Sequence, residues 1–208
     1  MLLTGLLFAC VTGVIRYLGS DMPGIQGAFI RYAIGTLMIA PLLLRNWTGI
    51  PERKTLQLYA ARALIHGVAV ILWFFAMARV PMAEVTALGY VAPIFVTIGA
   101  ALFLGERLHL RRLFGVGAGF VGAMVIVRPG FEEVNLGQLA QLSAAPLFAA
   151  SFIIAKKLTV QENSFMIVGS LSVGCTLTLL PGAILQWRSP TVEEIGWLSL
   201  SALLATTG

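Results

Sequence analysis

The sequence predicts an all-α membrane protein, a polytopic bundle of helices, and three observations lead to this fold class. Of the 208 residues, 58% are hydrophobic and only 11% are charged, and the mean hydropathy is +0.91. Long apolar segments alternate with short polar connections, and about 20 apolar residues in a helix cross the hydrocarbon core of a bilayer. The third observation is a repeat at an offset of 140 positions, which arranges these segments into two units.

Eight apolar segments follow one another, and each is expected to be a helix because a helix satisfies its own backbone hydrogen bonds in lipid. The fifth segment is short for a full span, and the eighth stops at the last residue of the sequence. No Lys or Arg precedes the apolar core of the first segment, so a signal peptide is not expected there. The segments cover residues 2–19, 25–44, 57–77, 84–104, 112–128, 137–155, 164–186 and 194–208.

The repeat aligns the two parts of the chain without a gap. The triplet at 7–9 recurs at 147–149, and the pair at 36–37 recurs at 176–177. We therefore expect one whole five-helix unit over residues 1–130 and an incomplete three-helix unit over residues 136–208. The same register also pairs Pro41 with Pro181, Trp47 with Trp187, and Leu58 with Leu198.

Basic residues predict how the helices are oriented. The connections after the second, fourth and sixth segments carry eight Lys and Arg, whereas those after the odd-numbered segments carry four. Cytoplasmic loops are enriched in these residues, which places the even connections and the N-terminus in the cytoplasm. Because the offset spans five helices, an odd number, the two units have inverted topology. Inverted repeats are typical of secondary transporters, although a duplication that only stabilises the bundle is the alternative.

Charged residues inside the apolar segments are candidate contacts for a solute. Arg31 lies in the second segment. Arg62 and His66 lie one turn apart in the third, on a helical face shared with Tyr59 and Trp73. A charge within a span costs at least ~2.5–3.5 kcal/mol on insertion scales and usually faces the bundle interior or water. Both arginines are therefore candidates to contact an anionic group, and the alternative is that they snorkel to lipid headgroups.

The fourth segment carries three more residues of interest. Glu84, in its first turn, either caps the helix or forms a gate or a partner for Arg31. Pro93 is expected to kink the helix because proline removes a backbone donor, and kinked helices often frame transporter sites. Tyr90 lies one turn before this proline. The predicted solute path comprises Arg31, Arg62, His66, Trp73, Glu84 and Tyr90.

Several other functions are not expected from the sequence. The formal charge of +5 and pI of 9.7 would suggest nucleic acid for a soluble protein, but here the basic residues mostly separate apolar segments. Cys10 and Cys175 each lie in an apolar segment and are expected to be buried thiols. Two distant histidines form no metal, cofactor or catalytic site, so no enzyme is expected. The expected partners are the lipid bilayer and a small-molecule metabolite, and pairing into a homodimer stays open.

Residues 62–130 resemble the EamA domain of the drug/metabolite transporter (DMT) superfamily. The second repeat resembles it more loosely, through the sixth and seventh segments. The motifs that carry the resemblance are WFFAMA at 73–78, PMAEVTAL at 81–88, APIF at 92–95, LGER at 104–107 and VRPG at 127–130, with FIRY at 29–32 and then Pro41 similar to the family's second helix.

The resemblance implies ten helices in two inverted five-helix repeats around a central cavity, with both termini in the cytoplasm. It also implies an exporter or exchanger of small polar metabolites, often amino acids or related compounds. We therefore expect a transporter of the bacterial inner (plasma) membrane that is C-terminally truncated, with about eight of the ten helices. The alternatives are a non-transporting structural membrane protein or pseudogene product and, third, a membrane enzyme.

Overall fold

The computed structural model describes Gly13 and residues 22–46, 49, 51–89, 91–105, 110–127 and 135–207. The described part folds into eight helices, which correspond to the second to eighth predicted segments, with the fourth segment divided in two. The first predicted segment, at 2–19, lies outside the described residues. The helices are α2 (Gly24–Arg45), α3 (Arg53–Met77), α4 (Met82–Gly89), α5 (Ala92–Leu104), α6 (Leu110–Val127), α7 (Leu136–Leu158), α8 (Ser164–Leu185) and α9 (Val192–Thr207).

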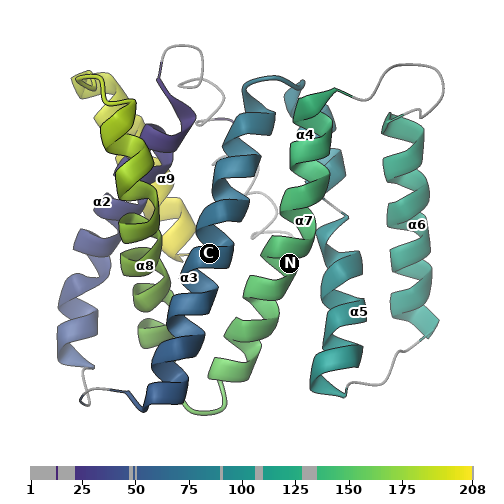
Figure 1. The fold of residues 1–208 in the computed structure, drawn as a ribbon, viewed down its shortest axis with the longest axis horizontal. Helices are drawn as coiled ribbons and strands as arrows, with labels where there is room; N and C mark the ends of the chain where they lie inside the picture. Colours follow the sequence, from purple (N-terminus) through teal and green to yellow (C-terminus); the bar gives the residue numbers. More distant parts are fainter. Residues whose placement is uncertain are drawn as a thin grey trace.

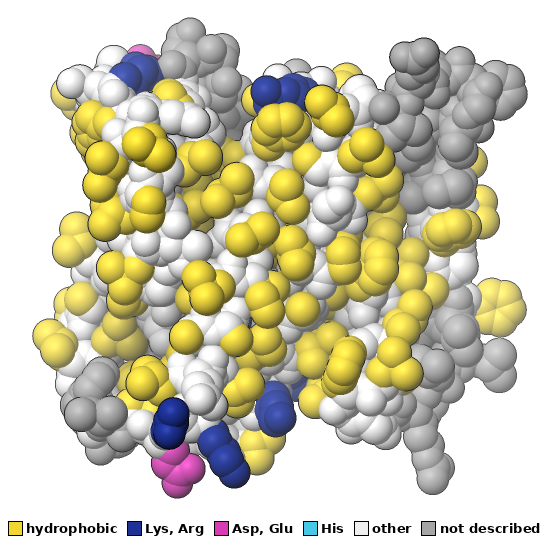
Figure 2. Space-filling view, viewed as in Figure 1, with side chains coloured by type: hydrophobic (Ala, Val, Ile, Leu, Met, Phe, Trp, Pro, Cys, Tyr) yellow, Lys and Arg dark blue, Asp and Glu magenta, His cyan; other side chains and the backbone are white. Residues whose placement is uncertain are grey.

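The helices stand side by side in the bundle (Figure 1). Within the described residues, five stretches are long and apolar enough to cross a membrane, namely α2, α3, α4 with α5, α7 and α8. Figure 2 shows hydrophobic side chains over the middle of one face, with Lys and Arg at its two ends. Large apolar side chains such as Leu44, Phe103 and Phe114 are 77–78% exposed, as lipid contact requires. The prediction of an all-helical, multi-pass membrane fold is confirmed.

Polar caps fix where several helices begin and end. The Asn135 side chain accepts a hydrogen bond from the Gln138 amide, and the Gln138 side chain accepts one from the Asn135 amide, which forms a capping box for α7. The Asn163 side chain accepts a hydrogen bond from the backbone amide of Met166 at the start of α8. Gly105 ends α5 with a φ of +67°, a left-handed conformation that favours glycine.

Prolines inside the apolar segments have different outcomes. α2, α7 and α8 each continue through an internal proline. The fourth segment is instead interrupted, because α4 ends at Gly89 and α5 begins at Ala92, with Pro93 in its first turn. Backbone N–H groups in the first turn of a helix form no hydrogen bond within that helix, so a proline there removes none. The new helix therefore accommodates Pro93 without strain. Tyr90 lies outside the described residues.

α3 occupies the centre of the bundle. It packs against α7 and α8 and also contacts α2 and α4, while α2 packs against α8 and α9. α5 packs against α7 and α6, and α6 stands at the edge of the bundle (Figure 1). The largest buried apolar cluster joins these central helices, and it includes Tyr32 of α2, Trp73 of α3 and the thiol of Cys175 of α8. The polar residues around His66 adjoin this core through Tyr32.

Candidate functional site

Polar side chains from three helices meet around His66. His66 Nε2 lies 3.0 Å from the hydroxyl of Tyr32 on α2, and Nδ1 lies 3.0 Å from the hydroxyl of Ser151 on α7. All three residues are buried, and the ring of Phe148 meets the imidazole edge-on. A neutral imidazole has one donor and one acceptor nitrogen. The two hydroxyls therefore satisfy both nitrogens of a neutral His66.

Arg62 lies one turn before His66 and is 7% exposed. Its Nη1 donates a hydrogen bond of 2.8 Å to the backbone carbonyl of Ile167 on α8. In the described part of the chain, its Nε has no hydrogen-bond partner, and neither does the hydroxyl of Tyr59, one turn earlier on α3. The guanidinium therefore lies inside the bundle, between α3 and α8, and not among lipid headgroups.

Arg31 joins this cluster through an aromatic ring. Its guanidinium carbon lies 4.7 Å from the centre of the Tyr32 ring, which is the geometry of a cation–π contact. The Tyr32 hydroxyl contacts His66, so Tyr32 links Arg31 to His66, and Arg62 lies one turn from His66 on the same face of α3. Sequence analysis named these three residues, and the fold brings them together.

The other predicted path residues lie apart from this cluster. Trp73 is two turns beyond His66 on α3, is 6% exposed, and packs edge-on against Phe74 in the apolar core. The Glu84 carboxylate, in the first turn of α4, accepts a hydrogen bond from the side-chain amide of Gln138 on α7. In the described part of the chain Glu84 is thus bonded to Gln138 and not to Arg31, and this contact joins α4 to α7. Tyr90 is outside the described residues.

Sequence analysis missed several buried polar residues. Tyr32 and Ser151 hold the two sides of His66. Gln141 on α7 is 3% exposed, and its side-chain oxygen has no hydrogen-bond partner. A signal was present, because Gln141 and Ser151 are polar residues within an apolar segment. Such residues usually turn toward the bundle interior.

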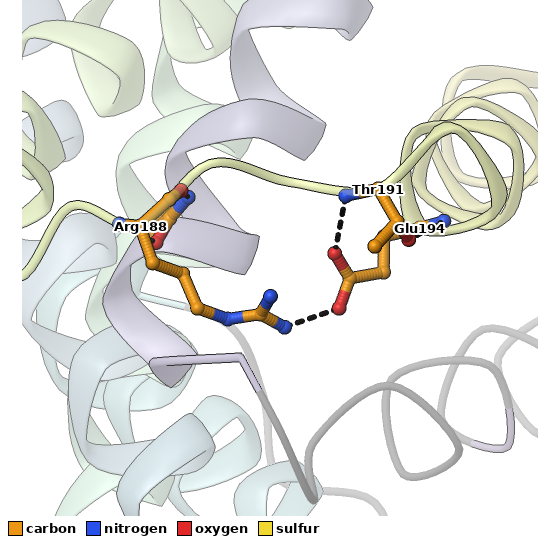
Figure 3. A network of polar contacts seen from close by, with 4 residues as sticks. Arg188, Thr191 and Glu194 are labelled. Atoms are coloured by element: carbon orange, nitrogen blue, oxygen red, sulfur yellow. Dashed lines mark hydrogen bonds and ion pairs between the residues drawn. The ribbon is translucent and has the colours of Figure 1, made fainter.

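A second polar network lies at the connection between α8 and α9 (Figure 3). Arg188 forms an ion pair with Glu194. The other Glu194 oxygen accepts a hydrogen bond of 2.7 Å from the Thr191 backbone amide, and the Thr191 hydroxyl accepts one from the Glu194 amide. Both atoms of the fully buried Gln26 side-chain amide bind the Arg188 backbone, its Nε2 donating to the carbonyl at 2.6 Å and its Oε1 accepting from the N–H at 3.1 Å.

The electrostatics of this connection favour ionised Glu194. The Thr191 backbone amide, which donates to the carboxylate, lowers the pKa of Glu194, and the Arg188 guanidinium lowers it further, while desolvation opposes both. Glu194 lies in the first turn of α9, outside the five candidate spans. Elsewhere in the described part of the chain, no three His, Cys, Asp or Glu side chains gather in a group that could hold a metal ion.

Comparisons with known proteins identify the family. Residues 1–128 match the model of the EamA-like transporter family. A riboflavin transporter of Vibrio cholerae serotype O1 is 32% identical over 206 residues, which cover 96% of this chain and 68% of that protein. The pseudopaline exporter CntI of Pseudomonas aeruginosa is 25% identical over 211 residues, covering 99% and 73%. An S-adenosylmethionine uptake transporter of Rickettsia bellii is 25% identical over 193 residues, covering 93% and 65%.

A solved crystal structure supports the fold independently. It aligns with 97% of this chain and 80% of its own length with a TM-score of 0.62, at 15% sequence identity. The chain spans about two thirds of the length of the V. cholerae relative, 68%. The family model covers more than half of the chain, and three kinds of relative carry small molecules across membranes. This chain therefore belongs to the EamA-like transporter family, as a multi-pass membrane protein among bacterial small-molecule transporters.

Proposed function

We propose that the chain is an inner-membrane secondary transporter, an exporter or exchanger of small polar metabolites such as amino acids or related compounds. The observation that carries this proposal is the polar cluster inside the bundle, where Arg62 and His66 are buried within a span. Burying a charge in a membrane span is costly, and such residues usually mark a path for solutes or ions. A bundle that served only as a scaffold would not need a buried polar cluster of this kind.

The packing of equivalent helices supports alternating access between two inverted units. The offset of 140 makes α2 the counterpart of α8, and these helices pack against each other. The hydroxyls of Thr36 and Thr176, which are equivalent residues, lie 3.3 Å apart. Equivalent residues meet only near a two-fold axis. An axis between α2 and α8 therefore fits the observed packing and would pass close to the polar cluster.

Two further contacts follow the same symmetry. α3 packs against α8, and its counterpart α9 packs against α2. Leu58 of α3 lies in a buried cluster with Ile167 of α8, and its equivalent, Leu198 of α9, lies in one with Ile30 of α2. In secondary transporters, inverted units rock about a central site. On this basis the proposed path keeps Arg31, Arg62, His66 and Trp73, with Glu84 and Tyr90 toward the interrupted fourth segment.

A transport assay tests the proposal. Membrane vesicles would carry the 208-residue chain and, in parallel, the same chain extended by any coding sequence that follows it in its genome. Flux of riboflavin, S-adenosylmethionine and a set of amino acids would be measured in both directions. Saturable flux of any of these solutes supports the proposal. Correct membrane insertion of both forms with no flux would favour the non-transporting membrane protein.

The variant Arg31→Ala then tests the path. We expect it to lower the rate of flux at least tenfold, because it removes a cation that contacts the ring of Tyr32. Arg45→Ala is the matched control, since Arg45 is exposed at the other end of the same helix. Unchanged flux in Arg31→Ala would remove Arg31 from the path.

A further inference from the structure

Charge inside the spans is positive and has little compensation. The sequence has nine Asp and Glu, and the five candidate spans contain one of them, Glu84, in a first turn. Arg31 and Arg62, in contrast, lie well inside α2 and α3. A buried cation without a paired anion is unfavourable. The interior of the bundle is therefore a place where an anion from outside the chain would be stabilised.

Two donors mark one location within this interior. The Tyr59 hydroxyl and Arg62 Nε are buried and have no hydrogen-bond partner among the residues that the structure describes. The two residues are 8% and 7% exposed and lie one turn apart on the same face of α3. The bond from Arg62 Nη1 to the Ile167 carbonyl holds the guanidinium in place beside Tyr59. A buried donor left unpaired is costly, so an acceptor supplied by a ligand would complete this pair.

Arg188 differs from Arg62 in that a carboxylate compensates its charge. Its Nε is also buried without a partner, but its guanidinium is paired with the Glu194 carboxylate. Within the described residues, the hydrogen bond of Arg62 goes to a neutral carbonyl, that of Ile167. An ionised oxygen binds a guanidinium more strongly than a neutral one does. An anionic oxygen is therefore the acceptor that would suit Arg62 Nε best.

One carboxylate of the chain stands near this pair. Glu162 interacts electrostatically with the Tyr59 hydroxyl, and it lies in the connection between α7 and α8, outside the spans. The Glu162 carboxylate is near enough for a weak hydrogen bond with this hydroxyl, but no hydrogen bond of ordinary length joins the two groups. Glu162 is thus placed to compete with an anion that enters from this end.

We propose that Tyr59 and Arg62 bind an anionic group of the transported solute, a carboxylate or a phosphate. The inference rests on the proposed transport function and deepens it by naming the substrate class. Solutes with an anionic group bind more tightly than neutral solutes of the same shape. Tyr59 donates through its hydroxyl and Arg62 through Nε, while Ile167 fixes the guanidinium.

Matched pairs of probes test this preference in the full chain, purified and placed in lipid nanodiscs. Riboflavin against flavin mononucleotide tests a phosphate, and N-acetyltryptophan amide against N-acetyltryptophan tests a carboxylate. Binding is measured by fluorescence. We expect the anionic member of at least one pair to bind tenfold or more tightly, and the pair that shows the preference identifies the group. Equal binding of both members in both pairs would overturn the proposal.

Two variants separate a ligand contact from a structural role. Tyr59→Phe removes a hydroxyl with no protein hydrogen bond, so it should weaken anion binding about fivefold while the melting temperature is unchanged or higher. Tyr32→Phe, which removes a hydroxyl bonded to His66, should lower the melting temperature. Arg62→Gln should abolish the anion preference. A lower melting temperature in Tyr59→Phe with the preference intact would contradict the proposal.

Glu162→Gln completes the test. Removing the competing charge should tighten anion binding. If it instead lowers the melting temperature and leaves binding unchanged, Glu162 is the acceptor of this pair and the anion site is refuted. Failure of the two proposals can be told apart. Flux of neutral solutes without an anion preference refutes only the anion site, whereas anion binding without flux refutes only transport.

Discussion

Arg62 is buried and Arg188 is partly exposed, and the regions around them differ in the groups that compensate the charge of each guanidinium. Arg188 sits in a connection where Glu194 supplies a carboxylate and Gln26 binds the backbone on both sides. Arg62 lies within a span, where its guanidinium donates a hydrogen bond to the carbonyl of Ile167. The charge of Arg188 is therefore compensated within the connection itself, which is consistent with a structural role. In the interior of the bundle, Arg62 Nε and the Tyr59 hydroxyl have no hydrogen-bond partner within the described part of the chain, and the proposed anion site rests on this difference.

The two regions also differ in how the chain builds them. The ion pair of the connection joins residues six positions apart, so local sequence is enough to form it. The contacts of the interior cluster join residues that are 34, 85 and 105 positions apart. Only the packing of α2, α3, α7 and α8 creates that cluster. The comparison therefore predicts that substitutions in the interior disturb several helices at once.

The largest expected effect is that of His66→Leu. This change leaves the buried hydroxyls of Tyr32 and Ser151 without their partner, at about 1–3 kcal/mol for each group. We expect a loss of about 3 kcal/mol in stability, measured by thermal unfolding in detergent. Adding Tyr32→Phe and Ser151→Ala should recover more than half of it, because no unpaired polar group then remains. If the triple variant were no more stable than the single one, the loss would not come from the unpaired hydroxyls of Tyr32 and Ser151.

A smaller effect is expected for Gln26→Leu in the connection. Gln26 is fully buried, and its side chain satisfies both the N–H and the carbonyl of Arg188. Its removal should cost about 2 kcal/mol, since two backbone groups lose their partner. Gln57→Leu is the matched control, because Gln57 is exposed on α3. Equal losses in the two variants would mean that Gln26 does not anchor the connection.

The smallest effect is expected for Glu194→Gln at neutral pH. Arg188 is 34% exposed, so water screens the ion pair and its loss costs no more than about 1 kcal/mol.

The contribution of Glu194 to the stability of the fold depends on pH. The pKa of Glu194 is lower in the folded protein than in the unfolded chain, so the pair stabilises the fold above the unfolded pKa. This contribution is lost as the pH falls through the folded pKa. Melting temperatures between pH 7 and pH 3 should therefore fall less steeply in Glu194→Gln than in the parent. Identical slopes would show that Glu194 contributes nothing to acid sensitivity.

The fold was largely readable from the sequence, because a membrane span has to be apolar and helical along its whole length. The predicted segment at 25–44 is α2 (Gly24–Arg45), and the segment at 137–155 lies within α7 (Leu136–Leu158). The effect of each proline was less readable. Neighbouring helices and small local adjustments can satisfy the backbone groups that a proline frees, and sequence alone does not give those neighbours.

The candidate site was readable only in part. Arg62 and His66 stood out because charged and ionisable residues are rare inside spans. Tyr32 and Ser151 stood out less, because a single hydroxyl group changes the polarity of an apolar segment only slightly. Their partner His66 also lies far away in the chain. Trp73 and Glu84 are plausible in sequence, but the structure gives them partners outside the cluster, Phe74 and Gln138.

The sequence by itself determined the medium in which this protein lies, the positions of its helices from the second onward, and the internal offset that pairs α2 with α8. These properties depend on local composition and on period, which a single chain displays directly. The tertiary structure decided which polar groups meet, that Arg62 lies inside the bundle, and that two buried donors, on Tyr59 and Arg62, have no hydrogen-bond partner in the described part of the chain. These properties depend on distances between helices, and only packing sets those distances.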